Sequence, residues 1–146
     1  MAELIYFDHS ATTPLDPRVT AAMQPYLSEA FGNPSSLHWA GRQAHSAIDQ
    51  GRQQVADLFH AAPDEIFFTA SGTEADNMVL IGVASQYKPQ DCQIITSSFE
   101  HPAILETCKY LEKLGYEISH LPVSSEGNVE PESLKAALRP NTLLVS

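Results

Sequence analysis

Residues 69–77 read Thr-Ala-Ser-Gly-Thr-Glu-Ala-Asp-Asn and lie between two apolar runs, at 65–68 and 78–81. The first run favours a β-strand, and the hydroxyl and acidic residues after it favour the start of a helix. Such a turn points backbone N–H groups and the positive end of a helix dipole at one place. Glycine is expected in it because glycine tolerates unusual backbone angles and lets a ligand approach closely. Gly72 and Thr73 are therefore candidate phosphate ligands, although a capped helix without a ligand would need the same residues.

A second candidate residue, His101, follows a later apolar run at 93–97. An imidazole at the end of a strand can stack on an electron-poor ring and can exchange protons near neutral pH. His101 and Gly72 come at the same relative end of neighbouring strand–helix units, which favours a shared site. The alternative is a helix-start histidine that bonds only to Glu100 or to water.

Predicted strands and helices alternate from residue 65 onward. Strands are predicted at 65–69, 93–97, 116–121 and 142–145, and helices at 73–87, 102–114 and 131–138. This order predicts an α/β fold, and the strands are mostly parallel if each helix is a crossover between strands. We therefore expect a mostly parallel sheet with helices on both faces.

The first part of the chain is predicted to hold a strand and two helices joined by polar loops. We expect a strand at 4–7, a helix from Pro17 to about Ala30 with a kink or break at Pro25, and a long amphipathic helix at 40–59. Asn33 lies in the irregular loop between the two helices. Its side-chain amide could bind a substrate carboxylate, and it could equally be a turn residue.

The charge balance excludes some classes of partner. The 146 residues carry a formal net charge of −10, with 8 Lys and Arg against 18 Asp and Glu. Nucleic acids and anionic membranes attract basic surfaces, so neither is an expected partner. No apolar run reaches the roughly 18 residues that span a bilayer, and no secretory signal is visible, so we expect a cytoplasmic protein.

The two cysteines, Cys92 and Cys108, form neither a disulfide framework nor a pattern typical of a metal site. Cys108 lies at helical spacing from apolar neighbours and is predicted to be in the core. Cys92 follows Asp91, an acidic neighbour that disfavours the thiolate. Neither cysteine is expected to be catalytic.

Four segments together resemble the cysteine desulfurases, within the class-V aminotransferase group of pyridoxal-phosphate enzymes. They are 7–14 (FDHSATTP), 31–36 (FGNPSS), 68–77 (FTASGTEADN) and 98–103 (SFEHPA). The segments follow the order and spacing of that family, and the resemblance runs almost from end to end of the chain.

The resemblance implies the N-terminal portion of a pyridoxal-phosphate transferase large domain of fold type I. Residues 1–40 would hold a strand, a helix and active-site loops, and residues 41–146 would be a partial cofactor-binding domain that stops after a strand. By the same resemblance, Gly72 and Thr73 bind the cofactor phosphate, and His101 stacks on the pyridine ring as a catalytic residue.

The reaction that the resemblance implies removes sulfur from L-cysteine and leaves L-alanine, with pyridoxal 5'-phosphate as the electron sink. An enzyme persulfide then carries the sulfur to an acceptor, such as an iron–sulfur scaffold protein, or to tRNA modification. The resemblance also implies a homodimer and places the loop of Asn33 near the substrate carboxylate. No metal is expected, because no CxxC pattern or nearby histidine pair accompanies the cysteines.

The family pattern continues past residue 146. The aspartate that pairs with the pyridine nitrogen, the Schiff-base lysine and the nucleophilic cysteine have no counterpart here. The lysines present lie outside the matching segments: Lys88, Lys109, Lys113 and Lys135. We therefore expect this chain to be the first third of such an enzyme, to offer only non-covalent cofactor contacts and to be inactive alone.

Two other functions stay open. One is another class-V enzyme, such as a selenocysteine lyase, a kynureninase-like hydrolase or an aminotransferase, because these relatives share the phosphate turn. The other is a non-catalytic interaction module that keeps this half-fold. The loop around Asn33 and the pair Glu100 and His101 favour the desulfurase.

Overall fold

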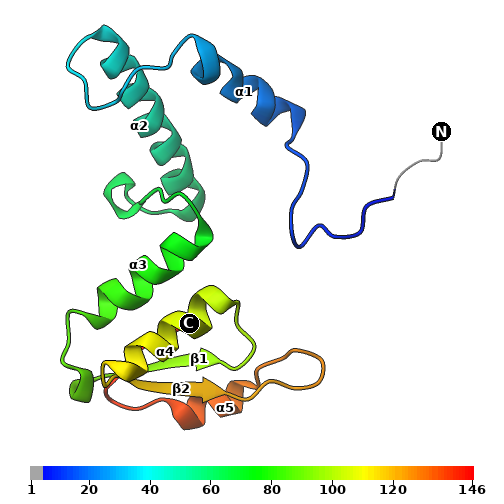
Figure 1. Cartoon of the computed structure of the whole chain (residues 1–146), viewed down its shortest axis with the longest axis vertical. Coiled ribbons are helices and arrows are strands. Elements are labelled where there is room, and N and C mark those ends of the chain that lie inside the picture. The colour runs from blue at the N-terminus through cyan, green and yellow to red at the C-terminus, as the bar shows by residue number, and fades with distance from the viewer. Residues whose placement is uncertain (1–4) are drawn as a thin grey trace. The chain divides into compact units, whose positions relative to one another are not determined.

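The computed structural model describes residues 5–146 and forms two compact units, Met1–Phe67 and Phe68–Ser146 (Figure 1). The first unit consists of helices and irregular segments, whereas the second holds the β-sheet. The division predicted from the sequence, between active-site loops at 1–40 and a cofactor-binding part at 41–146, concerns function and not compactness. It stays a prediction.

Helix α1 of the first unit spans Pro17–Ser28 and begins at the expected residue. The Asp16 carboxylate caps it by accepting a hydrogen bond from the Arg18 amide at 2.7 Å. Pro25 lies inside this helix, which continues to Ser28, so the proline does not end it.

Helix α2 spans Trp39–Phe59, within one residue of the predicted helix. The residue after its end, His60, caps it with a φ of 54°, a left-handed conformation typical of helix ends. A short 3-10 helix, Pro63–Glu65, follows. Although α2 is 21 residues long, neither it nor any other helix between residues 5 and 146 has the length and apolar character needed to cross a bilayer.

The second unit contains three parallel strands in the order β2-β1-β3. Their bounds are Gln93–Ser97 for β1, Glu117–Leu121 for β2 and Thr142–Val145 for β3. Each strand lies within one residue of its predicted position. All residues of β1 are buried, as expected for the central strand of a parallel sheet that is covered on both faces.

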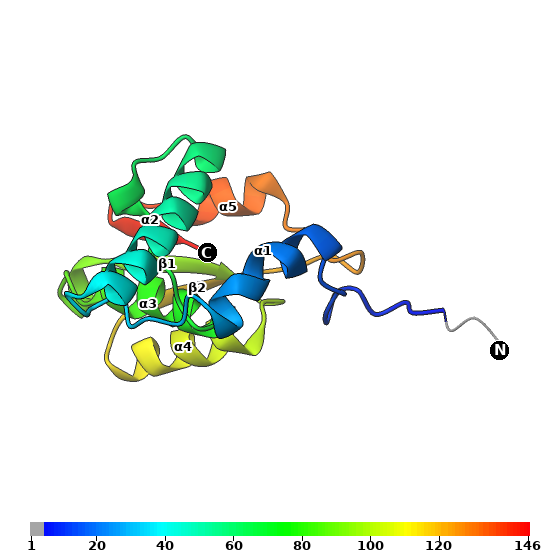
Figure 2. The same cartoon turned by 90° about the horizontal axis from the view of Figure 1, so that it is seen from above.

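Helices cover both faces of this sheet. Helices α3 (Gly72–Ala84) and α4 (Pro102–Lys113) share one apolar core with β1. The short α5 (Pro131–Ala137) packs on the opposite face, against β2, and a 3-10 turn, Pro89–Asp91, precedes β1. Figures 1 and 2 show α4 and α5 on opposite sides of the sheet. The predicted parallel α/β sheet with helices on both faces is confirmed.

Two predicted strands are absent, and these predictions were wrong. Residues 5–7 and 66–69 form no strand, residue 65 ends the 3-10 helix, and residue 4 lies outside the described part of the chain. Phe7 is 90% exposed and Phe67 is 70% exposed. An apolar run becomes a strand only beside another strand that supplies hydrogen bonds, and no strand among the described residues pairs with either run.

Candidate functional site

The amino end of α3 presents two backbone donors without an acceptor. Ser71 caps the helix: its Oγ accepts from the Glu74 amide at 3.2 Å, and its carbonyl accepts from the Ala75 amide at 3.1 Å. The amides of Gly72 and Thr73 have no acceptor within residues 5–146. Both residues are exposed. The helix start therefore offers an anion two N–H donors at the positive end of its dipole.

Gly72 does not adopt the unusual backbone conformation for which a glycine was expected at this turn. Only Gly115 and Gly127 have a positive φ among the described glycines, and Gly72 is the first residue of a regular helix. That part of the prediction was wrong. A Cβ added at Gly72 would meet nothing within 4 Å, so the space beside the free amides is open. The glycine keeps the approach to those amides unobstructed.

His101 is the cap residue of α4. Its Nδ1 accepts a hydrogen bond from the Ala103 amide at 3.1 Å, and Pro102 follows as the first helical residue. Because Nδ1 needs its lone pair for this bond, the neutral ring carries its hydrogen on Nε2. The side chain is exposed. One edge of the imidazole is thus fixed by the backbone, and the rest of the ring is accessible.

The loop from β1 to α4 is held by its own side chains. Ser97, the last residue of β1, donates through its Oγ to Glu100 Oε1 at 2.8 Å. Ser97 Oγ also accepts a hydrogen bond from the Phe99 amide at 3.2 Å. These bonds fix the residues that lead directly into His101.

The amino ends of α3 and α4 lie at the same end of the second unit. At the middle of both helices, Thr107 Oγ1 donates to Asn77 Oδ1 at 2.7 Å, and each residue lies five positions after the start of its helix. Near the carboxyl ends, the Tyr116 hydroxyl donates to the carbonyl of Ala84 at 3.1 Å. The helices therefore run parallel, side by side, as Figure 1 shows. The Gly72 turn and His101 share the end of the sheet where β1 terminates.

Asn33 stands in the first unit and serves its own loop. Its Oδ1 accepts from the Ser35 amide at 2.9 Å, which is the turn geometry given above as its alternative role. No acceptor within the described residues takes a hydrogen from its Nδ2. The loop lies tightly against α2, because a Cβ at Gly32 would overlap the carbonyl of Ala40 and one at Gly41 would overlap that of Ser36. Substrate binding by Asn33 stays a prediction.

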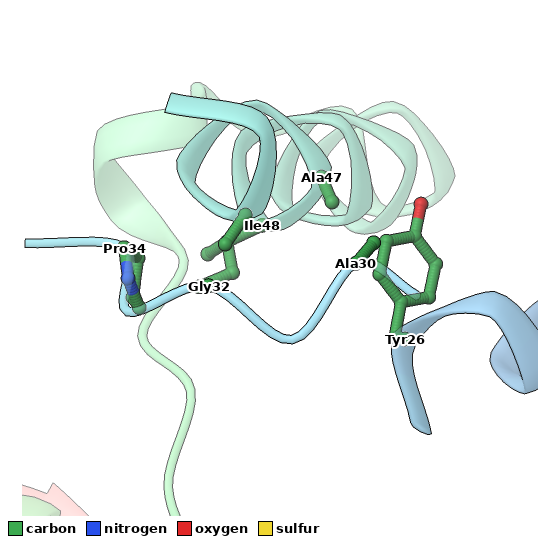
Figure 3. Close-up of a pocket in the computed structure, with 7 residues that line it drawn as sticks. Tyr26, Ala30, Gly32, Pro34, Ala47 and Ile48 are labelled. Atoms are coloured by element: carbon green, nitrogen blue, oxygen red, sulfur yellow. The ribbon is translucent and has the colours of Figure 1, made fainter. Parts of the chain in front are cut away.

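A pocket of about 320 Å³ lies beside this loop, between it and the two helices of the first unit (Figure 3). Its lining is almost entirely apolar: Tyr26, Ala30, Gly32, Pro34, Ala44, Ala47 and Ile48. The Tyr26 hydroxyl is its one titratable group. The pocket therefore lacks the acids, bases and charged groups that a catalytic centre needs.

Neither cysteine is suited to nucleophilic chemistry, as the sequence predicts. Both are buried and free. Burial raises the pKa of the Cys92 thiol, with a smaller effect from Asp91. Burial also raises the pKa of the Cys108 thiol, with smaller effects from Glu112 and Glu100. The thiolate is the reactive form, so these shifts suppress reactivity. Among the residues described, no cluster could hold a metal ion.

The polar pair Asn77 and Thr107 was not predicted from the sequence. Thr107 is buried on the otherwise apolar face of α4 that includes Ile104, Cys108 and Leu111. A threonine inside an apolar stripe is a signal that could have prompted a search for its partner, because buried hydroxyls are hydrogen-bonded. The identity of that partner depends on how the two helices meet.

Comparison with known proteins shows one consistent family. The chain matches the Aminotransferase class-V family over residues 5–146. It is 50% identical to a cysteine desulfurase IscS of Dictyoglomus turgidum, over 100% of this chain and 37% of that relative. The chain thus spans little more than a third of the length of this curated relative.

Two solved structures are similar throughout this chain. A NifS-like protein superposes with a TM-score of 0.90 at 40% identity, covering 97% of this chain and 39% of the other. SspA in complex with cysteine superposes with a TM-score of 0.87 at 37% identity, covering 96% and 40%.

Proposed function

Because the chain belongs to the aminotransferase class-V family, we propose that it forms the phosphate-binding and ring-stacking part of a pyridoxal-phosphate-dependent cysteine desulfurase. One observation supports this most strongly. The parallel packing of α3 and α4 puts the free amides of Gly72 and Thr73 at the same end of the sheet as the exposed ring of His101.

The donors at the start of α3 fit the phosphate of the cofactor. The amides of Gly72 and Thr73 and the Thr73 hydroxyl would hold it, and the helix dipole favours its negative charge. The neighbouring Glu74 carboxylate is already engaged, because its Oε2 accepts from the Ala70 amide at 2.7 Å. When bound, pyridoxal phosphate would supply an electron sink for charge that develops on the substrate.

His101 would orient the cofactor ring. Its Nδ1 is occupied by the Ala103 amide, so the imidazole is held in one orientation and can present its face to a pyridine ring. Its Nε2 remains available to hold or release a proton near the substrate. These two roles require the ring to be fixed and accessible at once.

The substrate proposed is L-cysteine, with L-alanine as the product and sulfur passed on as an enzyme persulfide to an acceptor such as an iron–sulfur scaffold protein. We propose a homodimer, and we propose that Asn33 binds the substrate carboxylate through its Nδ2 hydrogens. The buried thiols of Cys92 and Cys108 do not suit the sulfur-carrying role.

The 146 residues alone are proposed to contact the cofactor only non-covalently and to be inactive. Lys109 and Lys113 lie on α4 and Lys135 lies on α5. Lys109 Nζ pairs with Glu106 at 2.6 Å, and Lys135 Nζ pairs with Glu132 at 3.0 Å. Lys88 precedes a 3-10 turn before β1, at the opposite end of that strand from His101.

The test is product analysis of the full gene product after addition of pyridoxal phosphate. With L-cysteine and a thiol reductant such as dithiothreitol, which reduces the enzyme persulfide to free sulfide, we expect alanine and sulfide in equal amounts and an absorbance band from the bound cofactor. A His101→Ala variant should lose turnover, whereas the control His120→Ala, on β2 beside Glu112, should keep it. Turnover of selenocysteine alone would indicate the lyase, and absence of cofactor binding would overturn the proposal.

A further inference from the structure

Building on the proposed function, we propose that Asn77 is a positioning residue that joins the phosphate-binding turn to the helix capped by His101. Asn77 Nδ2 donates to the carbonyl of Thr73 at 2.8 Å, and Asn77 Oδ1 accepts from Thr107 Oγ1 at 2.7 Å. Thr73 belongs to the first turn of α3, and Thr107 belongs to α4. One side chain thus spans the two helices that make up the candidate site.

The hydrogen bonds continue as far as the His101 ring. Thr107 Oγ1 also donates to the carbonyl of Ala103, at 2.8 Å, so its single hydrogen is shared between two acceptors. The amide of the same Ala103 donates to His101 Nδ1 at 3.1 Å. A continuous chain of contacts therefore runs from Thr73 through Asn77, Thr107 and Ala103 to the imidazole.

The neighbours determine which way the Asn77 amide faces. With Nδ2 toward the Thr73 carbonyl, both ends of the amide are satisfied. A flipped amide would set Oδ1 against that carbonyl oxygen, so that two acceptors would meet. Asn77 therefore needs both its donor and its acceptor, and neither Asp nor Leu can replace it.

This contact supplies a constraint that the surrounding packing does not. The core around it is apolar and includes Leu80, Ala84, Cys108 and Leu111. Apolar contacts are non-directional, whereas a satisfied polar contact inside an apolar core favours one arrangement. The bond between Asn77 and Thr107 therefore fixes how far α3 is displaced along α4, and with it the offset between the phosphate donors and His101.

The experiment compares binding of pyridoxal 5'-phosphate and of pyridoxal by the full gene product. Both carry the same ring and aldehyde, so the ratio of their dissociation constants isolates the contribution of the phosphate. We expect Thr107→Val to weaken pyridoxal phosphate binding by about five-fold, the size of one hydrogen bond, and pyridoxal binding by less than about two-fold. Thr107→Ser, which keeps the hydroxyl, should restore the ratio.

Two further variants keep the test decisive. Asn77→Ala should reproduce the loss of Thr107→Val at a half-buried position, which serves if the valine variant fails to fold. Tyr116→Phe is the matched control, because it removes the hydroxyl that bonds to the carbonyl of Ala84 at the far end of the two helices. It should lower the melting temperature and leave the ratio unchanged.

The outcomes separate this inference from the proposed function. If the wild type binds pyridoxal phosphate no better than pyridoxal, the phosphate site itself is wrong and both proposals fall. If the wild type discriminates and both Thr107→Val and Asn77→Ala keep its ratio, the positioning role is overturned and the proposed function stands. Equal weakening of both compounds would mean a purely structural role and would also overturn it.

Discussion

Two polar clusters of the second unit differ in how their hydrogen bonds are met. The side chain of Gln93, on β1, is fully buried and fully paired. Its Nε2 donates to Ser119 Oγ at 2.7 Å and to the carbonyl of Ala137 at 3.3 Å, and its Oε1 accepts from Thr142 Oγ1 at 2.6 Å. By contrast, the backbone amides at the start of α3 belong to two exposed residues, Gly72 and Thr73. These amides have no acceptor among the described residues.

The difference separates polar groups that hold the fold from polar groups that are free to bind. Gln93 joins all three strands and α5, so its atoms are used up by the protein. At the start of α3, Ser71 accepts hydrogen bonds from the amides of Glu74 and Ala75 only. The two preceding amides therefore remain as donors for a ligand. Substitution in the Gln93 cluster should therefore lower stability, whereas substitution at the Gly72 turn should lower ligand binding.

The largest effect is expected for Gln93→Leu, which removes the buried amide from its three half-buried partners, the Ser119 hydroxyl, the Thr142 hydroxyl and the Ala137 carbonyl. We expect the free energy of unfolding to fall by about 3 kcal/mol, measured by urea denaturation. The control Gln90→Leu, on the exposed 3-10 turn, should change it by less than about 0.5 kcal/mol. Equal effects for the two variants would contradict a structural role for the Gln93 cluster.

Gly72→Glu should affect binding and leave stability intact. A side chain at this position meets open space, and an acid at a helix start stabilises the helix. We therefore expect an unchanged or higher melting temperature and at least a roughly tenfold loss of pyridoxal phosphate affinity, because the carboxylate would repel the phosphate. Gly72→Gln has the same bulk without the charge, and binding by it should fall less. Full affinity in the glutamate variant would rule out this phosphate site.

Ser71→Ala should cost about 1 kcal/mol of stability through loss of the helix cap. The Ser71 hydroxyl accepts from the Glu74 amide at 3.2 Å, and alanine would leave that amide unpaired. Ser71→Thr keeps the acceptor and should lose little. Thermal unfolding followed by circular dichroism measures the difference, and equal melting temperatures for the wild type and the alanine variant would show that the cap contributes nothing.

The smallest effect concerns pH and the first unit. A hydrogen bond from the Arg18 side chain lowers the pKa of Asp16 below its ordinary value of 3.8. The contribution of this carboxylate to stability is therefore complete above that value and is lost as the pH falls through the lowered folded-state pKa. Asp16→Asn should show a slightly smaller loss of helix content between neutral pH and pH 3 than the wild type. An identical acid response would contradict this role.

The sequence was most informative where local chemistry decides the structure. The cap of α1 at Asp16, the strand at Gln93–Ser97 and the helix start at Pro102 could all be read from neighbouring residues. The predicted strand at 65–69 failed because a strand also depends on its partner. The bond between Asn77 and Thr107 joins residues 30 positions apart and depends on the meeting of two helices, which no local pattern encodes.

The tight loop around Asn33 has a consequence for reading alignments of this family. Gly32 and Gly41 leave no room for a Cβ because each lies against a backbone carbonyl of the same loop or of the start of α2. Selection for an unclashed backbone would keep these glycines invariant even in a protein that had lost its substrate. Invariance of glycine at these two sites would record a steric requirement of the backbone and would carry no information about a ligand.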